Sequence, residues 1–400
     1  MSIKRIKNPE VLYITGETVP GNNGGSVHVW EVASNLCKLG YEVTLISQKQ
    51  GTLAHSEYLK GVKLLRTNMQ YSNKILSIAG LKLLPQLLIR NFDIIIERYV
   101  TFGGVGTIYS KLKKIPLILE VNSPHTEELI WRYNITCKTT INILRTWRDI
   151  QFRQAKKVIA TSLTVVPEHA RLKTEQVRWA ANTDMFRPEL RNTDKANNIR
   201  KIYNLENKFT IVFAGTFRKW HGALDLPELV KAVVSKAKNV QFLFVGGGEC
   251  LDEVKAKIRD MHLSQYAVFT GTQKYEMMPY FMAVSDVGIA PYNAAYYKPL
   301  KDFGFFWSPL KIFEYMASGL PVITVSYDPL PKIVINGETG FITPAEDPSK
   351  IAEAIINLAK NPLNASRMGK KARESVENNY TWKLHVDNLD KIIKDTIRKD

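Results

Sequence analysis

Ser308-Pro-Leu-Lys-Ile-Phe-Glu-Tyr-Met-Ala-Ser-Gly-Leu-Pro-Val-Ile323 is the stretch that most constrains the fold. Pro309 suits the first turn of a helix, and Gly319-Leu-Pro321 ends that helix before a short apolar run, a predicted strand. Lys311 and Glu314 share one face of the helix. A cation near a helix start can pair with a phosphate, while a carboxylate accepts hydrogen bonds from a ribose diol. The alternative is a buried helix whose Lys–Glu pair is solvated.

Short apolar segments alternate with helix-length amphipathic segments along most of the chain. This alternation predicts an α/β fold with parallel sheets covered on both faces. In the first half, strands are predicted at 11–14, 42–47, 63–66, 93–98, 116–121, 157–160 and 177–180. The alternation restarts with predicted strands at 210–215, 241–245, 267–270, 287–290, 321–325 and 340–342. From about residue 347 only helices are predicted, joined near 361–362 and 380–381.

Length and cysteine content narrow the class of protein. The 400 residues exceed what one hydrophobic core usually organises, so two domains are expected. Cys37, Cys137 and Cys250 are odd in number and lack metal-ligand spacing, so neither a disulfide framework nor a zinc site is predicted. Residues 1–15 show no long apolar region and no small-residue cleavage site. We therefore expect a cytoplasmic protein.

The net charge of +17 is distributed unevenly. Residues 1–195 hold 28 Lys and Arg against 16 Asp and Glu, and the remainder hold 27 against 22. The basic residues are scattered and no nucleic-acid motif is present, so we expect no nucleic-acid partner. The excess favours an anionic membrane face or an anionic acceptor, with simple solubility as the alternative.

One segment of the basic half is a candidate for membrane contact. Residues 73–90 combine a wide apolar stripe with Lys74, Lys82 and Arg90, which predicts reversible docking at a membrane interface, peripheral to the inner face. The alternative is a helix that packs on the sheet with its basic residues in water.

Three turns that follow predicted strands contain glycines or cations. Ligands of α/β sheets bind beyond the carboxyl ends of the strands, so these turns are candidate anion sites. Flexible loops, solvated side chains and tight turns are the alternatives. The candidate residues of the three turns are Gly24 and Gly25 in the first, Thr216, Arg218, Lys219 and His221 in the second, and Gly247 in the third.

Two further strand ends carry candidate groups in the first half. Arg98 ends one predicted strand, and Asn122 follows another. His125 is the only histidine at such a strand end in this half, where an imidazole can bind a sugar hydroxyl or assist proton movement. An ordinary surface histidine is the alternative.

In their order along the chain, these motifs resemble the GT-B retaining glycosyltransferases of the group 1, or family 4, class. The resemblance covers nearly the whole chain. It rests on Gly24-Gly25, Asn182-Thr-Asp-Met-Phe-Arg-Pro188, Phe213-Ala-Gly-Thr-Phe217 with Trp220-His-Gly222, Phe244-Val-Gly-Gly-Gly-Glu249, Phe269-Thr-Gly271, Ser285-Asp-Val-Gly-Ile-Ala-Pro-Tyr292, Pro309-Leu-Lys-Ile-Phe-Glu-Tyr-Met-Ala317 with Gly319-Leu-Pro-Val322, and Asn336-Gly-Glu-Thr-Gly-Phe341.

The resemblance implies two Rossmann-like, doubly wound domains that face each other across a cleft. Residues 1–195 would form the acceptor-side domain and residues 196–370 the nucleotide-sugar domain. Residues 371–400 would form a helical segment that returns to the N-terminal domain. No metal and no other cofactor is needed in that class. The resemblance further implies that the acceptor enters on the face that the diphosphate leaves, which retains the configuration of the sugar.

The resemblance also implies roles for single residues. Glu314 would accept the ribose hydroxyls, with the Gly24-Gly25 loop and the backbone from Ser308 to Leu310 against the donor. Thr216 and His221 stand where many relatives have phosphate-binding cations, so Arg218, Lys219 and above all Lys311 would supply that charge. Phe306 replaces a glutamate that contacts the transferred sugar in relatives. His125, Lys311 and Arg218 are therefore the predicted catalytic residues, donor contacts are predicted for Thr216, Lys219, His221 and Gly247, and Arg98 and Asn122 belong to the predicted acceptor side.

The function implied is a retaining transfer of a sugar, a hexose by expectation, from a nucleoside-diphosphate sugar to an acceptor hydroxyl. The acceptor would be a glycan or a lipid-linked molecule in glycan, glycolipid or surface-polysaccharide assembly. Two alternatives stay open. One is another GT-B enzyme, such as a sugar-nucleotide epimerase or hydrolase. The other is a sugar-nucleotide-binding subunit without activity, which the substitutions at Thr216, His221 and Phe306 support.

Overall fold

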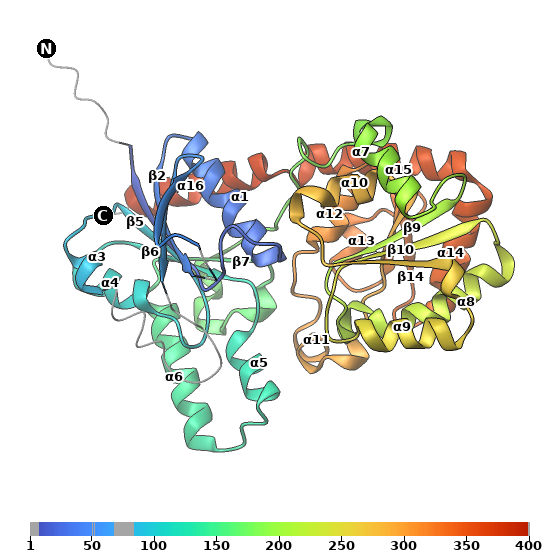
Figure 1. The fold of residues 1–400 in the computed structure, drawn as a ribbon. Helices are drawn as coiled ribbons and strands as arrows, with labels where there is room; N and C mark the ends of the chain where they lie inside the picture. Colours follow the sequence, from blue (N-terminus) through green and yellow to red (C-terminus); the bar gives the residue numbers. More distant parts are fainter. Residues whose placement is uncertain (1–7, 50, 52, 68–83, 399–400) are drawn as a thin grey trace, which may run out of the picture. The chain divides into compact units, whose positions relative to one another are not determined.

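The computed structural model describes residues 8–49, 51, 53–67 and 84–398. Contacts between residues divide the chain into two compact units (Figure 1). Unit 1 contains Met1–Trp179, Phe306–Ser308 and Trp382–Asp400. Unit 2 contains Ala180–Phe305 and Pro309–Thr381. The chain therefore passes between the units at four points.

Unit 1 is built on an eight-stranded sheet, as far as the described residues go. Its strand order is β3-β4-β2-β1-β5-β6-β7-β8, and every neighbouring pair is parallel except β3 with β4. The central strands are runs of Val, Ile and Leu because both faces are covered. The strands are β1 (Glu10–Ile14), β2 (Glu42–Gln48), β3 (Ser56–Leu59), β4 (Val62–Thr67), β5 (Ile94–Arg98), β6 (Leu117–Val121), β7 (Lys157–Ala160) and β8 (Thr174–Gln176).

Helices cover the sheet of unit 1. Helix α1 (Gly24–Lys38) begins where the Asn23 side chain accepts the Ser26 N–H, a typical N-cap. The last helix, α16 (Trp382–Arg398), contacts α1 and buries its apolar stripe, although some 340 residues separate the two in sequence. The other helices are α3 (Leu84–Leu88), α4 (Val105–Lys113), α5 (His125–Arg132) and α6 (Lys138–Gln154).

Unit 2 contains a six-stranded sheet in which every neighbouring pair is parallel. Its order is β11-β10-β9-β12-β13-β14, with β9 (Phe209–Ala214), β10 (Val240–Val245), β11 (Ala267–Gly271), β12 (Val287–Ala290), β13 (Val322–Val325) and β14 (Gly340–Thr343). The helices are α7 (Asp194–Ile202), α8 (Leu226–Lys236), α9 (Leu251–Asp260), α10 (Met278–Ala283), α11 (Lys298–Phe303), α12 (Leu310–Ala317), α13 (Leu330–Ile333), α14 (Pro348–Lys360) and α15 (Pro362–Asn379).

The predicted alternation is confirmed, with two differences at sheet edges. The strand predicted at 177–180 is wrong: β8 lies at Thr174–Gln176, while the Trp179 ring stacks on His28. The antiparallel strand β3 was not predicted. Both β3 and β8 are short, largely exposed edge strands, so neither carries an apolar signal.

The units differ from the predicted domain ranges. Residues 180–195 group with unit 2, where the Arg373 guanidinium donates to the carbonyls of Thr183 and Phe186. Helix α16 groups with unit 1, whereas residues 371–379 belong to α15 in unit 2.

The segment predicted to dock on a membrane lies outside the described residues up to position 83, and its last part forms α3. Within the described ranges, no helix has both the length and the apolarity needed to span a bilayer.

Candidate functional site

In each sheet the strand order reverses at one place. In unit 1 the chain builds outward in one direction from β1 and in the other from β5, and these two strands are neighbours. In unit 2 the same reversal falls between β9 and β12. Loops diverge from the carboxyl ends of such strand pairs and leave room for a ligand. Most of the predicted site residues lie at these two places.

Helix α12 is fixed at the reversal point of unit 2 by Tyr315. The Ala214 N–H at the end of β9 donates to the Tyr315 hydroxyl at 2.8 Å, and that hydroxyl lies 3.4 Å from the Ile289 carbonyl of β12. A Cβ on Gly288 would lie 2.4 Å from the Tyr315 ring, so only glycine lets the ring pack there. The sequence therefore holds α12 against the end of β9.

Lys311 lies one turn before Tyr315, and its ammonium is buried in unit 2. Its ammonium is buried and has no hydrogen-bond partner among the described residues. It lies 4.6 Å from the Phe213 ring centroid, and a Cβ on Gly215 would be 3.2 Å from it. Burial lowers the pKa of Lys311 to about 7, against the opposing influence of Glu314. A buried cation without a partner is costly, which points to an anionic ligand at this strand end.

Glu314 is buried one turn from Lys311 on the same helix. Its Oε1 accepts a hydrogen bond from the Tyr275 hydroxyl at 2.8 Å. The predicted pairing of a cation and a carboxylate on one face of this helix is therefore present. A carboxylate in this position can accept hydrogen bonds from a diol.

The loop after β9 holds the other predicted cations differently. The Thr216 carbonyl lies 2.7 Å from His221 Nδ1 and can only accept, so that nitrogen carries the proton. Burial and the nearby Lys311 keep the pKa of His221 well below its usual value, so the imidazole is neutral. Arg218 and Lys219 are exposed, and the Arg218 guanidinium lies 5.1 Å from the Trp220 ring centroid. Among Lys311, Arg218, Lys219 and His221, Lys311 is the one whose charge is buried at this strand end.

Glycines let the loops after β9 and β10 approach each other. The Gly247 carbonyl accepts the Phe217 N–H at 2.8 Å, and a Cβ on Gly247 would lie 2.6 Å from Thr272 Oγ1. A Cβ on Gly246 would lie 2.0 Å from the Gly215 carbonyl oxygen. These glycines therefore allow the two loops to pack backbone against backbone at this edge.

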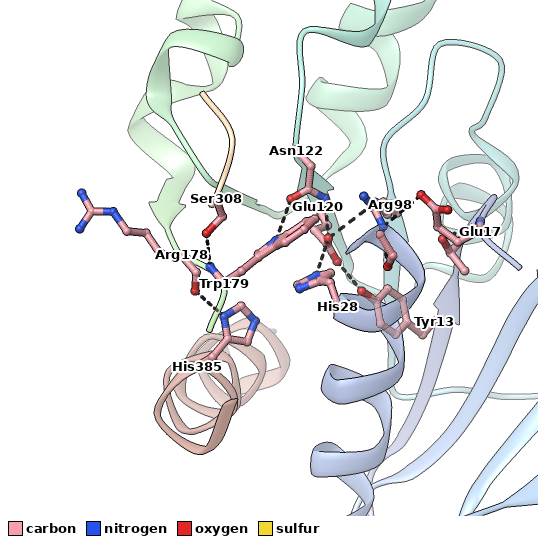
Figure 2. A network of polar contacts seen from close by, with 12 residues as sticks. Tyr13, Glu17, His28, Arg98, Glu120, Asn122, Arg178, Trp179, Ser308 and His385 are labelled. Atoms are coloured by element: carbon pink, nitrogen blue, oxygen red, sulfur yellow. Dashed lines mark hydrogen bonds and ion pairs between the residues drawn. The ribbon is translucent and has the colours of Figure 1, made fainter. Parts of the chain in front are cut away.

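In unit 1, Arg98 connects the end of β5 to the glycine turn (Figure 2). Its Nη1 donates to the Gly25 carbonyl at 3.0 Å and lies 3.5 Å from Glu17 Oε1. A Cβ on Gly25 would meet Glu17 Oε1 at 2.3 Å. The predicted residues Gly24, Gly25 and Arg98 are thus brought together, with Arg98 orienting the turn.

Next to Arg98, a buried carboxylate gathers several polar groups (Figure 2). Glu120 accepts hydrogen bonds from the Tyr13 hydroxyl at 2.5 Å and from Asn122 Nδ2 at 2.6 Å, and His28 Nε2 lies 2.8 Å from it. Burial alone would raise the pKa of Glu120, but His28, Arg98 and Tyr13 hold it well below its usual range. Glu120 is therefore an anion that fixes its neighbours.

Trp179 joins this network to the point where the chain leaves unit 1. Its indole N–H donates to Asn122 Oδ1 at 3.2 Å, and its backbone N–H donates to Ser308 Oγ at 2.8 Å. Its ring stacks on His28 with the centroids 4.5 Å apart. The side chains of Asn122 and Ser308 are thus engaged within unit 1, and Leu310 begins α12 in unit 2. The Thr161 hydroxyl donates a hydrogen bond to the Phe306 carbonyl at 2.7 Å.

His125 is the first residue of α5, and its tautomer follows from its contacts. The Thr101 N–H can only donate, and it does so to His125 Nδ1 at 3.2 Å. The proton of the neutral ring is therefore on Nε2. Burial lowers the pKa of His125, so the ring is a neutral donor near pH 7.

Sequence reasoning missed Glu120, Tyr275 and Tyr315. The signal for Glu120 was a charged residue inside the otherwise apolar strand Leu117–Val121. Glu97 interrupts β5 in the same way, but it caps α4 by accepting the N–H groups of Gly104 and Thr107. Tyr275 and Tyr315 had no local signal.

The part of the chain that the structure describes contains no group of three or more His, Cys, Asp or Glu side chains placed to hold a metal ion.

Family models match most of the chain. Residues 194–375 match the model for glycosyl transferases group 1. Residues 22–180 match the model for glycosyltransferase family 4. The family 4 match lies mainly in unit 1 and the group 1 match mainly in unit 2, and α16 lies outside both.

Individual relatives are distant. An uncharacterized glycosyltransferase of Methanocaldococcus jannaschii is 25% identical over 193 residues, which is 47% of this chain and 46% of the relative. The chain thus spans about half the length of that relative. A GDP-mannose-dependent alpha-(1-6)-phosphatidylinositol monomannoside mannosyltransferase of Mycolicibacterium smegmatis is 24% identical over 278 residues, covering 68% of this chain and 69% of the relative.

Among solved structures, Anabaena HepE in complex with UDP and glucose has a TM-score of 0.73. The similarity covers 97% of this chain and 100% of HepE at 16% sequence identity. This likeness shows the fold.

Proposed function

Because this chain belongs to the group 1, or family 4, class of GT-B glycosyltransferases, we propose that it transfers a sugar from a nucleoside-diphosphate sugar to an acceptor hydroxyl. Retention of configuration and a hexose as the transferred sugar are parts of the proposal. We propose that the positive charge comes from the chain itself, without a resident metal or other cofactor.

Lys311 is the observation that carries this proposal. Its ammonium is buried at the carboxyl end of β9, beside Gly215, with no hydrogen-bond partner among the described residues. A diphosphate there would give the ammonium a partner and raise its pKa from about 7, which would restore its charge. Glu314, one turn further on, would accept the ribose hydroxyls. Gly247 and the backbone from Ser308 to Leu310 would line the donor, and Thr216 and His221 would contact it through the loop that their hydrogen bond shapes.

Catalysis in this proposal is mainly electrostatic. As the bond between sugar and diphosphate breaks, negative charge grows on the leaving group, and Lys311 with Arg218 and Lys219 would stabilise that charge more in the transition state than in the ground state. His125, neutral with its proton on Nε2, would donate a hydrogen bond to the reacting sugar or its acceptor. The Gly24-Gly25 turn, oriented by Arg98, would lie against the diphosphate.

The acceptor is proposed to be a glycan or lipid-linked molecule that unit 1 presents, with Arg98 and Asn122 shaping its site. The Mycolicibacterium relative is named for a lipid acceptor, which favours the lipid-linked class. We propose that the protein acts in the cytoplasm, in glycan, glycolipid or surface-polysaccharide assembly, and that it makes peripheral contact with an anionic membrane.

A donor screen tests the proposal. HepE was solved with UDP and the Mycolicibacterium relative is named for GDP-mannose, so UDP-, GDP- and ADP-sugars are the first set. A ligand at a hundred times its dissociation constant should stabilise the protein by about 2.7 kcal/mol, which a thermal shift detects. A shift with release of the nucleoside diphosphate supports the enzyme. If no sugar nucleotide produces a shift, the donor site is wrong.

A binding subunit without activity is the second candidate. The neutral His221 favours it, because one of the usual phosphate cations is replaced by a group without charge. A thermal shift without turnover on any acceptor would support this candidate. The epimerase alternative predicts a changed sugar nucleotide instead of a free nucleoside diphosphate.

A further inference from the structure

The end of α5, the turn after it and the start of α6 carry exposed aromatic, aliphatic and basic side chains. Trp131 is 39% exposed, Tyr133 45% and Ile143 63%. Arg132 and Lys138 are exposed beside them. We call these five residues the α5–α6 tip. In Figure 1 the two helices extend away from the sheet of unit 1 and meet at this turn.

The charge of the α5–α6 tip has one sign. Residues 129–145 contain no Asp or Glu. Arg145 is paired with Glu127 at 2.8 Å near the base of the hairpin. Arg132 and Lys138 form no ion pair with any residue that the structure describes. The tip therefore keeps two positive charges that no ion pair among the described residues neutralises.

This combination suits a lipid interface better than water. Single exposed apolar residues are ordinary on protein surfaces, but Trp and Tyr beside Arg and Lys is the composition of bilayer interfaces. The rings prefer the headgroup level, and the cations are attracted by anionic headgroups. An acidic side chain would oppose that attraction, and residues 129–145 have none.

The α5–α6 tip is connected directly to the candidate site. Helix α5 begins at His125 and ends at Arg132, a length of 8 residues. At a rise of about 1.5 Å per residue, the tip lies about 12 Å along the helix from His125. A lipid surface that binds the tip would hold a headgroup about the length of this short helix away from the His125 imidazole.

We propose that the α5–α6 tip docks reversibly on an anionic lipid surface and thereby brings unit 1 to a lipid-linked acceptor. The choice of acceptor rests on the proposed function, whereas the docking itself does not. This surface is separate from residues 73–90, for which the sequence predicted docking.

Cys137 provides a probe inside the turn. Its thiol is exposed, and hydrogen bonds from Thr140 lower its pKa, so it should react more readily than the other two thiols. In a Cys37→Ser variant, Cys137 is the one exposed cysteine, since Cys250 is buried. An environment-sensitive fluorophore on Cys137 should shift to the blue with vesicles of phosphatidylglycerol and phosphatidylcholine. The shift should fall steeply with salt and be absent with phosphatidylcholine alone.

Variants test the same surface by vesicle co-sedimentation at low salt. Arg132→Gln with Lys138→Gln should weaken binding about thirtyfold, about fivefold for each charge removed. Trp131→Ala with Tyr133→Ala should also weaken it, without changing the thermal shift given by a sugar nucleotide. The matched control is Lys360→Gln with Leu363→Ala in the turn between α14 and α15, where Leu363 is 89% exposed. That control should bind vesicles as the unchanged protein does.

Three results would overturn the proposal. They are equal binding by the tip variants and the unchanged protein, no preference for anionic vesicles, and burial of the probe in a dimer at the same concentration without vesicles. Donor binding is measured without lipid, so a failure of docking leaves the thermal-shift result standing. Conversely, vesicle binding by a protein that recognises no sugar nucleotide would keep the docking surface and reject the donor site.

Discussion

At the scale of single residues, Lys311 has the environment that a bound diphosphate would change most. Its pKa of about 7 means that roughly half of the free protein lacks this charge at neutral pH. Only the protonated form should bind a diphosphate well. We therefore predict that the dissociation constant for the nucleoside diphosphate rises as pH increases above 7, by up to about tenfold per unit.

Calorimetric titration from pH 6 to 9 measures this dependence, and Lys311→Met should flatten it. The same substitution should lower turnover about a hundredfold or more, with a smaller loss of affinity, because the charge matters most as the diphosphate leaves. A loss of affinity with unchanged turnover would show a ground-state contact only.

Glu314→Gln should weaken donor binding by about 1–2 kcal/mol, because charge-assisted hydrogen bonds to the ribose diol, worth about 1.5–3 kcal/mol, become neutral ones worth about 0.5–1.5. The Tyr275 hydroxyl can still donate to the glutamine oxygen, so the fold should be kept. Titration with the nucleoside diphosphate and a thermal melt separate the two effects. A collapse of stability with unchanged affinity would assign Glu314 a structural role. Tyr275→Phe is the control, because it removes the 2.8 Å protein contact and leaves the carboxylate.

For unit 2 the sequence indicated where the candidate residues lie, but not their burial or protonation. The spacing of Lys311 and Glu314 indicated a shared helix face, and the structure confirms it. That the Lys311 ammonium is buried beside Gly215, and that His221 is neutral, follows from packing between distant segments. No local pattern encodes either fact. Glu120 had a local signal, as a charged residue inside an apolar strand, but its partners come from β1, α1 and β5, and no local pattern links them.

At the scale of elements, the position of α12 depends on one glycine. A Cβ on Gly288 would lie 2.4 Å from the Tyr315 ring, so Gly288→Ala should push α12 away from β12. We expect a loss of stability of about 1–3 kcal/mol. We also expect a loss of nucleotide affinity, because Lys311 and Glu314 move with the helix. Chemical denaturation and calorimetry measure the two quantities. Gly337→Ala meets nothing within 4 Å and strains only its own backbone, at a φ of +78°, so it should cost some stability but leave the affinity unchanged.

The contact between α1 and α16 should depend on pH through His385. This residue is buried, its Nδ1 lies 2.7 Å from the Arg178 carbonyl, and burial together with His28 lowers its pKa to about 4. The folded form stays neutral where the unfolded chain, with a pKa near 6.5, takes up a proton. Stability is thus full above about pH 6.5 and is lost as the pH falls towards 4, by up to about 3 kcal/mol.

Hydrogen exchange of α1 and α16 at pH 7 and at pH 4.5 measures this loss, after correction for the intrinsic rates. His385→Gln can still donate to the Arg178 carbonyl and should reduce the difference between the two pH values. An unchanged difference in this variant would assign the acid sensitivity to other groups.

Most elements could be predicted because their signals are local. Buried parallel strands are largely apolar, and β1, β5 and β6 are of this kind, although Glu97 and Glu120 interrupt the last two. Edge strands β3 and β8 pair with only one neighbouring strand and keep polar side chains, so their sequences resemble those of loops. The helices after residue 347 were predicted correctly, including their junctions near Asn361 and Tyr380.

At the scale of the whole molecule, unit 1 is completed by the end of the chain. Helix α16 buries Trp382, Val386, Leu389 and Ile393, and the Asp390 carboxylate accepts a hydrogen bond from Tyr41 at 2.7 Å. A protein that ends at residue 380 would leave the matching face of α1 in water. We therefore predict that this truncation destabilises unit 1 and leaves the sheet of unit 2 intact, because the contacts of α16 lie in unit 1.

Hydrogen exchange resolves the two units in one experiment. Amides of β1, β2 and α1 should exchange faster in the truncated protein, while those of β9, β10 and β12 keep their protection. The thermal shift given by a nucleoside diphosphate should persist if unit 2 alone holds the donor. A synthetic peptide of residues 381–400 should restore protection in unit 1, whereas a peptide with Trp382 and Leu389 both changed to Ser should not. Equal loss of protection in both units would show that they unfold together, and the chain would then be one cooperative body.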